Sequence, residues 1–214
     1  ILTKSYTYGP GGHGIVATSL LDTFNEKVFV TGFLGGINGE YFHKSLLDRN
    51  IAHEFLPIKE ETRTRIKLLD RQGFCTTILE DSPRITRDEV SRFYGLYNRL
   101  IDKANIVTCV GDHQPLALPN DIYFNLVNIA REKRKRIILD IGNHGLNLAI
   151  DAIPYMVIVD QKQLEDIIGL NFNFDNEIIK AGRYILDKGV KYLAINLYER
   201  GSMVLGQDKG YLLD

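Results

Sequence analysis

The second half of the chain alternates short apolar runs with longer amphipathic segments, and this rhythm restricts the possible folds most. The apolar runs predict strands at 106–110, 136–140, 156–159 and 192–197. The segments at 120–133, 145–153, 161–168 and 176–188 carry apolar residues at helical spacing. Apolar strands that alternate with amphipathic helices form a parallel sheet covered on both faces. We therefore expect an α/β fold.

The first half breaks this rhythm. Its patterns predict helices at 12–24 and 39–49, a buried strand at 27–33, and a helix that begins with a Thr86–Glu89 capping box. Three strands follow one another without helices, at 51–55, 63–69 and 74–79. Arg71-Gln72-Gly73 forms a tight turn between the last two, which predicts a hairpin. We expect these three strands to form a separate small sheet.

The strand at 63–69 carries a cation at every second position. Arg63, Arg65 and Lys67 then share one face, since side chains two apart in a strand point the same way. Arginine offers a planar fork to a phosphate or carboxylate, and lysine adds a mobile point charge. The alternative is a solvated edge strand whose charges discourage aggregation. On this segment alone the solvated edge strand is slightly favoured, and a bound anion stays open.

Composition limits the partners. The 214 residues carry a formal net charge of −1, which gives no reason to expect nucleic acid or an anionic membrane as a partner. The two cysteines, Cys75 and Cys109, are isolated in apolar runs, which predicts buried free thiols in a reducing compartment. No transmembrane stretch or signal peptide is evident, so we expect a cytoplasmic protein.

Polar residues follow several predicted strands, where ligands bind in open parallel sheets. They are His13, Gly35-Gly36, Gly111-Asp112-His113, Asp140, Asp160 and Asn196. The alternative is that they are turn formers and helix caps. The segment 9–14 also fits G-x-G-x-x-G, but its preceding strand is polar and the next strand ends without an acidic residue, which argues against dinucleotide binding.

Three longer pieces carry a resemblance that covers essentially the whole chain. They are Pro10-Gly11-Gly12-His13-Gly14-Ile15, Thr31-Gly32-Phe33-Leu34-Gly35-Gly36-Ile37-Asn38-Gly39-Glu40 and Glu61-Thr62-Arg63-Thr64-Arg65-Ile66-Lys67. Together they resemble the ribokinase-like sugar kinases (the phosphofructokinase B family), and most closely the branch of 1-phosphofructokinase and tagatose-6-phosphate kinase. This resemblance implies a three-layer α/β/α core at 9–50 and 80–214. It also implies a small β-sheet lid at 1–8 and 51–79.

The resemblance also implies roles for individual residues. Gly11, Gly12 and His13 would contact the sugar, and Gly36 would allow close approach of the backbone to it. Arg63, Arg65 and Lys67 would hold a phosphate already on the substrate. ATP with Mg²⁺ would lie over the later strands, with Asn196 and Gly201 on the nucleotide side and Asp160 near the metal. Lids of this kind often pair in a homodimer.

Several positions depart from the family pattern. His13 stands where the family has lysine, Arg65 where this branch has asparagine, and Tyr198 where the nucleotide-side turn has glycine. The magnesium motif Asn-x-x-Glu reads Asp160-Gln161-Lys162-Gln163. The Gly-Ala-Gly-Asp segment that supplies the catalytic base is absent from these residues, so the base is unknown. We interpret Ile1 and Asp214 as the edges of a fragment.

The expected function is ATP-dependent phosphorylation of a sugar phosphate, of the fructose 1-phosphate or tagatose 6-phosphate type, at a free hydroxyl. Two alternatives stay open. A degenerate paralogue that binds a sugar phosphate without turnover would account for the altered magnesium and nucleotide motifs. A nucleoside or vitamin kinase on the same fold would fit the cationic strand poorly.

Overall fold

A computed structural model describes residues 5–111 and 117–213 of the chain. The chain divides into two compact units, residues 1–93 and residues 94–214, and each is described by itself. Among the described residues, no helix is both long and apolar enough to span a membrane.

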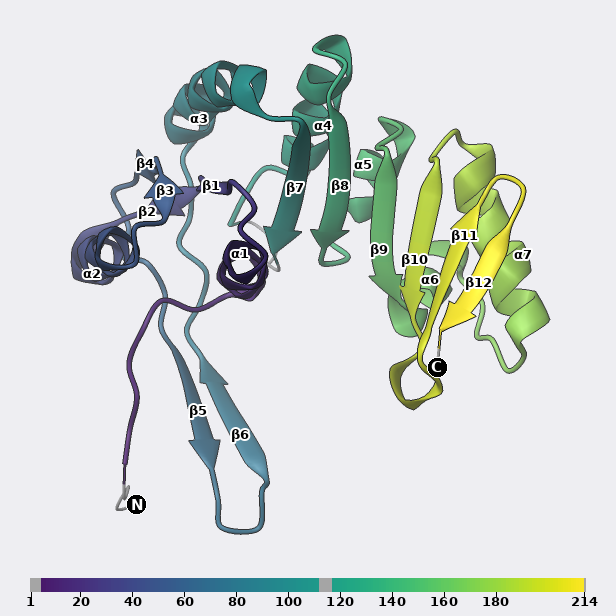
Figure 1. The fold of residues 1–214 in the computed structure, drawn as a ribbon, viewed down its shortest axis with the longest axis horizontal. Helices are drawn as coiled ribbons and strands as arrows, with labels where there is room; N and C mark the ends of the chain where they lie inside the picture. Colours follow the sequence, from purple (N-terminus) through teal and green to yellow (C-terminus); the bar gives the residue numbers. More distant parts are fainter. Residues whose placement is uncertain (1–4, 112–116, 214) are drawn as a thin grey trace. The chain divides into compact units, whose positions relative to one another are not determined.

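The second unit is built on one sheet, with the strand order β12-β11-β10-β9-β8-β7 (Figure 1). Its strands are β7 (Ile106–Gly111), β8 (Arg136–Ile141), β9 (Met156–Asp160), β10 (Tyr192–Asn196), β11 (Ser202–Gly206) and β12 (Gly210–Leu213). The strands β7 to β10 run parallel, as expected from the sequence. The two that follow pair antiparallel because the connections before them are too short for a crossover helix. The α/β fold class is confirmed, with a mixed sheet.

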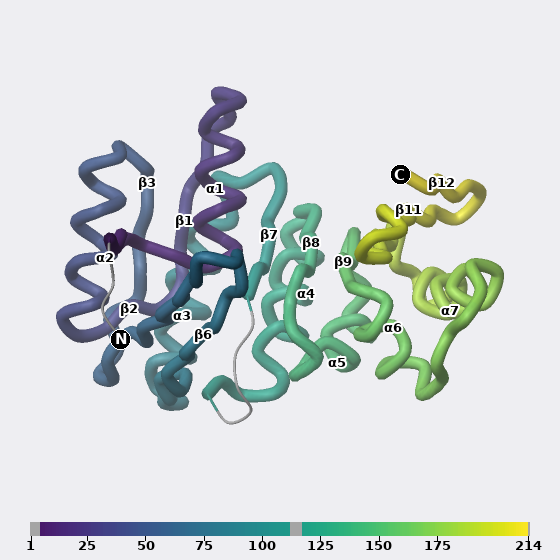
Figure 2. Tube along the Cα trace, turned by 90° about the horizontal axis from the view of Figure 1, so that it is seen from below, coloured from purple at the N-terminus to yellow at the C-terminus, as the bar shows by residue number. Residues whose placement is uncertain are grey.

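Helices connect the parallel strands of this unit. They are α4 (Ile122–Glu132), α5 (Leu146–Asp151), α6 (Gln161–Ile168) and α7 (Asp175–Asp187), with the short turns η1 (Ile101–Lys103) and η2 (Tyr198–Arg200). These four α-helices lie on one face of the sheet (Figure 2). Alternate strand residues such as Ile137, Leu139 and Leu193 are fully buried on that face. Those between them, such as Ile138 and Ala194, are half-buried.

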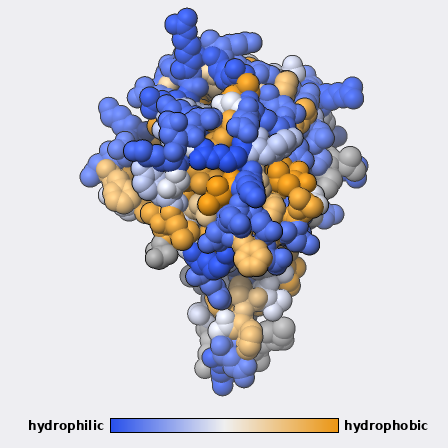
Figure 3. Space-filling model, turned by 90° about the vertical axis from the view of Figure 1, so that its right-hand side faces the viewer, coloured by the Kyte–Doolittle hydropathy of each residue, from blue (hydrophilic) through white to orange (hydrophobic). Residues whose placement is uncertain are grey.

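The strand β12 at the end of the sheet has exposed side chains. Tyr211, Leu212 and Leu213 keep half or more of their surface in solvent. A space-filling view toward this side of the molecule shows apolar side chains intermixed with polar ones (Figure 3). The edge strand of this sheet therefore leaves apolar side chains in contact with solvent.

The first unit contains a parallel pairing split into two short pieces. The strand predicted at 27–33 is β1 (Phe29–Val30) and β2 (Phe33–Leu34), which pair with β3 (Ala52–His53) and β4 (Leu56–Pro57). Backbone bonds continue between the pieces, since the amide of Leu56 donates to the Gly32 carbonyl at 2.9 Å. The expectation that this stretch is buried was wrong, because Phe29 is half exposed.

Two α-helices accompany these strands. They are α1 (His13–Thr23) and α2 (Gly36–Asp48), and α2 makes the crossover between the paired strands. A small apolar cluster of Ile15, Leu46 and Ile51 joins the two helices to the strand region. Residues 5–8, expected in the lid sheet, form no strand, and residues 1–4 lie outside the described part.

The predicted hairpin is confirmed. It consists of β5 (Arg65–Leu69) and β6 (Cys75–Leu79), which pair antiparallel and project from the rest of the first unit (Figure 1). The expected sheet of three consecutive strands was wrong, because β3 and β4 pair with β1 and β2 instead. Cys75 is exposed rather than buried, since the hairpin is solvated on both faces.

Cys109 has a different environment from Cys75. Both thiols are free, as expected, but Cys109 lies in β7 and is largely enclosed. Burial of the thiol disfavours its ionised form and raises the pKa of Cys109 to about 12. This thiol is therefore a poor nucleophile at neutral pH.

The helix α3 (Arg87–Leu100) has the N-terminus that the sequence predicts. The Thr86 amide and hydroxyl both donate to the Glu89 carboxylate at 2.7 Å, and the Glu89 amide donates back to the Thr86 hydroxyl at 3.2 Å. Glu89 also accepts a bond from the Lys59 amide at 2.8 Å, so the cap ties the helix to the residues after β4. This capping box is confirmed.

Candidate functional site

The strand predicted at 63–69, which we call the lid strand, carries three cations that occupy two kinds of position. Arg65 and Lys67 lie on β5 with exposed side chains, opposite Leu79 and Thr77 of β6. In the described part of the chain neither of these two forms an ion pair. Their charges are therefore balanced by solvent in this structure and are accessible to an anion from outside.

Arg63 precedes β5 and is half-buried. Its Nη1 donates to the Ser82 hydroxyl at 2.8 Å. The neighbouring Thr62 and Thr64 both contact Asn38 of α2, so the side chain of Arg63 points away from that helix. The predicted separation of the threonine face from the arginine face is confirmed here.

The start of α2 is joined to the beginning of the lid strand by a set of hydrogen bonds. The Thr62 amide donates to the Gly35 carbonyl at 2.9 Å, and the Gly35 amide donates to the Thr62 hydroxyl at 2.9 Å. The Asn38 side-chain amide donates to the Thr62 carbonyl at 2.8 Å and to the Thr64 hydroxyl at 3.2 Å.

A carboxylate completes this junction. Glu61 accepts bonds from the amides of Ile37 and Asn38, at 3.1 and 2.6 Å. We call Gly35, Gly36, Asn38, Glu61 and Thr62 the α2 clasp. Gly36 has a φ of +65°, and a Cβ there would overlap the Glu61 carboxylate. The group that approaches Gly36 in this structure is thus the side chain of Glu61. The predicted contact of Gly36 with the sugar stays a prediction.

The N-terminal segment reaches the same helix through an aromatic residue. The Tyr8 hydroxyl donates to the Asn38 side-chain oxygen at 3.1 Å, and the Tyr41 hydroxyl donates to the Tyr8 carbonyl at 3.2 Å. The two rings stack with centroids 4.5 Å apart. This contact fixes the chain just before the predicted sugar-binding glycines.

Those glycines lie in open surroundings. Gly11 and Gly12 are exposed, and a Cβ on either would meet nothing within 4 Å. Gly12 precedes α1 with a φ of +108°, which favours glycine. His13 is the first residue of α1 and is exposed. The segment is accessible to a ligand from solvent.

On the nucleotide side, two predicted residues end neighbouring parallel strands. Asp160 and Asn196 are paired in the register of β9 and β10, so their side chains start from adjacent strand ends. The Asn196 side-chain oxygen accepts from the Tyr198 amide at 2.8 Å. Gly201 ends the following turn with a φ of +83°. The predicted Asp112 and His113 lie outside the described residues.

Asp160 is engaged in capping α6. Its Oδ1 accepts from the Gln163 amide at 2.7 Å, while the Gln163 side chain accepts from the Asp160 amide at 3.0 Å. The Tyr198 hydroxyl also bonds to Asp160 and accepts from the Lys162 amide. The backbone of Tyr198 has a left-handed φ of +58°. Desolvation, followed by the nearby Asp160 charge, raises the pKa of this phenol.

These contacts bear on the expected Mg²⁺. Among the described residues no group of three histidine, cysteine or acidic side chains could hold a metal ion. Asp160 is a single carboxylate, and its Oδ1 already caps α6, so it does not make a metal site by itself. The residues as placed do not fit direct Mg²⁺ ligation; a contact through water, which Mg²⁺ often keeps, stays a prediction for Asp160.

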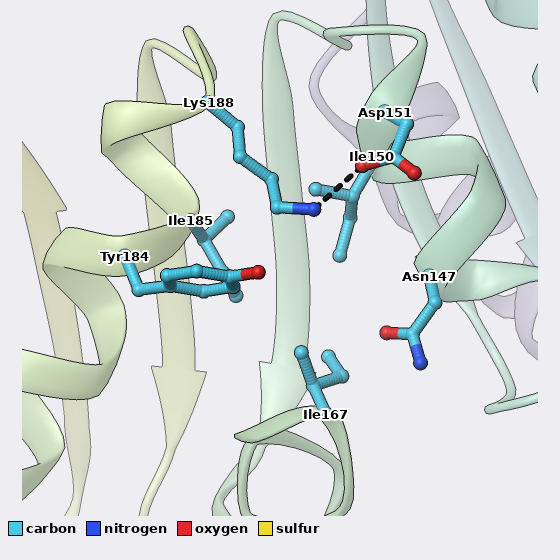
Figure 4. Close-up of a pocket in the computed structure, with 7 residues that line it drawn as sticks. All are labelled: Asn147, Ile150, Asp151, Ile167, Tyr184, Ile185 and Lys188. Carbon is cyan, nitrogen blue, oxygen red and sulfur yellow. Dashed lines mark hydrogen bonds and ion pairs between the residues drawn. The ribbon is translucent and has the colours of Figure 1, made fainter.

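The second unit has a cavity of about 230 Å³ on its helical side (Figure 4). Apolar side chains from α5, α6 and α7 line it: Ile150, Ile167 and Ile185. Lys188 and Asp151 pair at its rim with 2.6 Å between Nζ and Oδ1. None of the predicted site residues lines this cavity, and its cation is already neutralised.

Comparison with known proteins identifies the family. Residues 1–214 match the model of the pfkB family of carbohydrate kinases. The chain belongs to this family. It is 32% identical over 197 residues to the 1-phosphofructokinase of Borreliella burgdorferi, covering 92% of this chain and 62% of that protein. The pfkB chain thus spans less than two thirds of that relative's length.

Solved structures agree on the fold. Phosphofructokinase-2 from Escherichia coli with fructose-6-phosphate superposes with a TM-score of 0.87 at 18% identity, over 97% of this pfkB chain and 69% of that one. A candidate 1-phosphofructokinase from Thermotoga maritima gives a TM-score of 0.86 at 22% identity, over 98% and 67% of the two chains. These likenesses confirm the expected ribokinase-like architecture.

The substrate-side candidates of this pfkB chain all lie in the first unit, and the nucleotide-side candidates all lie in the second. Sequence reasoning missed Glu61, Asn38 and Ser82 as partners of the site. A signal was available for the first of these: α2 begins with Gly36 after the N-cap residue Gly35, so it has no capping side chain of its own. Such a helix start needs an acceptor from elsewhere in the chain.

Proposed function

We propose that the protein carrying this chain transfers the γ-phosphoryl group of ATP to a free hydroxyl of a sugar phosphate, of the fructose 1-phosphate or tagatose 6-phosphate type. The main observation in support of this proposal is the group of three cations on and beside the hairpin: Arg63, Arg65 and Lys67. Membership of the pfkB family supports carbohydrate kinase activity, and these cations support a substrate that already bears a phosphate.

The positions of these cations support phosphate recognition. Arg65 and Lys67 are exposed and form no ion pair in the described part of the chain, so a phosphate need not displace a protein carboxylate from them. Arg63 is already oriented by its bond to Ser82. A guanidinium that is held in place loses less conformational freedom when it binds an oxyanion. Gly11, Gly12, His13 and Gly36 complete the proposed sugar side.

Phosphoryl transfer of this type depends on positioning and on charge stabilisation more than on covalent chemistry. In our proposal the lid cations hold the existing phosphate, and the segment before α1 orients the sugar. Asn196 and Gly201 contact the nucleotide at the end of β10, and Asp160 acts near its phosphates. No residue of these 214 is assigned as the catalytic base.

A second candidate function is binding of a sugar phosphate without turnover. Two observations favour it: Asp160 is committed to the cap of α6, and the Tyr198 phenol bonds to that carboxylate. Both features occupy the strand ends where the nucleotide would approach. Detectable sugar-phosphate binding without ATP binding would select this function, whereas turnover of nucleosides or vitamins that lack a phosphate would favour a nucleoside or vitamin kinase.

We also propose a homodimer through the hairpin. Ile66 and Ile78 pair across β5 and β6 on the face opposite Arg65 and Lys67, and each exposes about half of its side chain. An isolated two-stranded hairpin is marginally stable in water, so a partner that covers this apolar face would stabilise it. A second copy of the chain offers the same surface.

The experiment for the proposed function replaces one lid cation. We expect Arg63→Ala to raise KM for the sugar phosphate about tenfold, because a charge-assisted bond to phosphate is lost. KM for ATP should stay within twofold or so. Arg71→Ala, in the turn of the same hairpin, is the matched control and should change neither constant. Equal effects of Arg63→Ala on both substrates would contradict phosphate recognition by this arginine.

A further inference from the structure

The start of α2 takes its cap from a distant part of the chain. Its N-cap residue, Gly35, has no side chain, and the first turn contains no acidic residue. The Glu61 carboxylate fills this role, one oxygen for the Ile37 amide and the other for the Asn38 amide. A negative charge at this end of a helix is also favoured by the helix dipole.

Glu61 lies two residues before Arg63 in the sequence, so the cap of α2 also affects the lid strand. Glu61 directly precedes Thr62, whose amide and hydroxyl are bonded to Gly35. Asn38 then holds the Thr62 carbonyl and the Thr64 hydroxyl. The residues on both sides of Arg63 are thus tied to the start of α2, Thr62 through its backbone and hydroxyl and Thr64 through its hydroxyl. The Glu61 carboxylate completes this arrangement.

The junction requires glycine at the N-cap, Gly35, and at the first residue of α2, Gly36. A Cβ on Gly36 would overlap the Glu61 carboxylate, and one on Gly35 would overlap the carbonyl of Glu60. The start of α2 can therefore approach Glu60 and Glu61 closely only with glycine at both positions. The two segments are 23 or 24 residues apart in the sequence, so the contact is specific to the fold.

We propose that Glu61 is a positioning residue for the sugar-phosphate site. Its carboxylate holds the start of α2 against Thr62 and against the side chain of Thr64, and so keeps Arg63 on the face turned away from α2. This inference rests on the proposed function, in which Arg63 binds the phosphate of the substrate. A carboxylate suits the task because it offers two acceptors, whereas a carboxamide would turn an NH₂ group toward one of the two amides.

The first part of the test measures the clasp without a ligand. Hydrogen exchange of the Ile37, Asn38 and Thr62 amides is followed by NMR in the wild-type protein, Glu61→Gln and Glu61→Ala. We expect exchange to accelerate at least about tenfold in Glu61→Ala and less in Glu61→Gln, because one bond remains in the latter. Glu40→Gln, which removes an exposed carboxylate from the same helix, is the matched control.

The second part measures binding by calorimetry with fructose 1-phosphate, tagatose 6-phosphate and ATP. We expect Glu61→Ala to weaken sugar-phosphate binding about tenfold and to leave ATP binding unchanged. In a turnover assay the change should appear in KM rather than in kcat. Faster exchange with unchanged sugar-phosphate affinity would overturn the positioning role, as would equal losses for ATP and the sugar phosphate.

Two further results keep the inference separate from the proposed function and from simple unfolding. If Glu61→Ala does not fold, Glu61→Gln, which keeps one of the two bonds, should give the same pair of effects at a smaller size. If the wild-type protein binds neither sugar phosphate, the proposed function fails and with it the substrate role of Glu61. Exchange at Thr62 would then still report whether the carboxylate holds this segment.

Discussion

Gly35 and Gly36 are adjacent at the start of α2 but require glycine for different reasons. Gly36 has a left-handed φ of +65°, whereas Gly35 has an extended backbone that any residue adopts. What excludes a side chain at Gly35 is space, since its Cβ would overlap the carbonyl of Glu60 and lie 2.6 Å from that of Ile58. Backbone carbonyls cannot rotate away as a flexible side chain can.

Substitution at Gly35 should therefore destabilise the first unit through steric overlap. We expect Gly35→Ala to lower the free energy of unfolding by about 1 to 3 kcal/mol, the usual cost of overpacking. Gly11→Ala is the matched control, because a Cβ there meets open space. Urea denaturation of both variants checks this prediction, and equal stabilities would contradict it.

The roles of these single residues were only partly predictable from the sequence. The spacing of Arg65 and Lys67 follows from strand geometry, and their shared face was predicted correctly. The engagement of Gly36 with Glu61 was not foreseen, because it joins residues that only the folded backbone brings together. The exposure of Cys75 was mispredicted because an apolar run does not reveal whether a hairpin is covered.

The helix α3 depends on a buried carboxylate at its first turn. Glu89 is only 4% exposed and accepts bonds from Thr86 and Lys59. The hydrogen bond from the Thr86 side chain, followed in effect by the backbone bonds from Thr86 and Lys59, lowers the pKa of Glu89. A lowered pKa in the folded state means that the stabilisation is present above the unfolded-state value and is lost as the pH falls through the folded one.

We expect Glu89→Gln to reduce the free energy of unfolding at pH 7 by about 1 to 2 kcal/mol, because charge-assisted bonds are lost. The difference from the wild-type protein should begin to shrink below the unfolded-state pKa of about 4.3 and should disappear once the pH is below the lowered pKa of the folded state, where the wild-type carboxyl is protonated. Thermal unfolding measured from pH 7 to pH 3 checks the prediction. Asp88→Asn, at an exposed site in the same turn, is the control; a constant difference at every pH would argue against this account.

Elements with strong periodicity were predicted well. The parallel strands and the helices of the second unit begin and end within a few residues of their expected positions, since alternating apolar runs and amphipathic segments determine them locally. The three strands after residue 50 were grouped wrongly, because strand pairing depends on partners far away in the sequence. Gly32, with a φ of +154°, splits the first expected strand in a way that its apolar pattern does not show.

The whole chain belongs to the pfkB family along residues 1–214, so the family fold is established for both units. The choice of substrate depends on fewer residues, and the sequence could suggest it only through the cationic strand. A phosphofructokinase-2 from Escherichia coli is described in a tetrameric inhibited form, which is a property of that protein. For this chain we expect a homodimer, as proposed above from the apolar face of the hairpin.

We expect the wild-type protein to have twice the monomer mass in multi-angle light scattering, owing to association of the apolar hairpin faces. Ile66→Asp places a charge on that face and should yield a monomer, because an unpaired buried charge is costly. Leu69→Asp alters the opposite face of the same strand and serves as the control. A monomeric wild-type protein at micromolar concentration would exclude the proposed dimer.

The most direct test of substrate recognition compares sugars with and without a phosphate. Calorimetry with fructose 1-phosphate, tagatose 6-phosphate, fructose and tagatose measures what the lid cations contribute. Our account predicts that at least one phosphorylated sugar binds more than about tenfold tighter than its unphosphorylated counterpart, and that Arg63→Ala removes most of this difference. Equal affinities for the phosphorylated and unphosphorylated sugars would contradict the account.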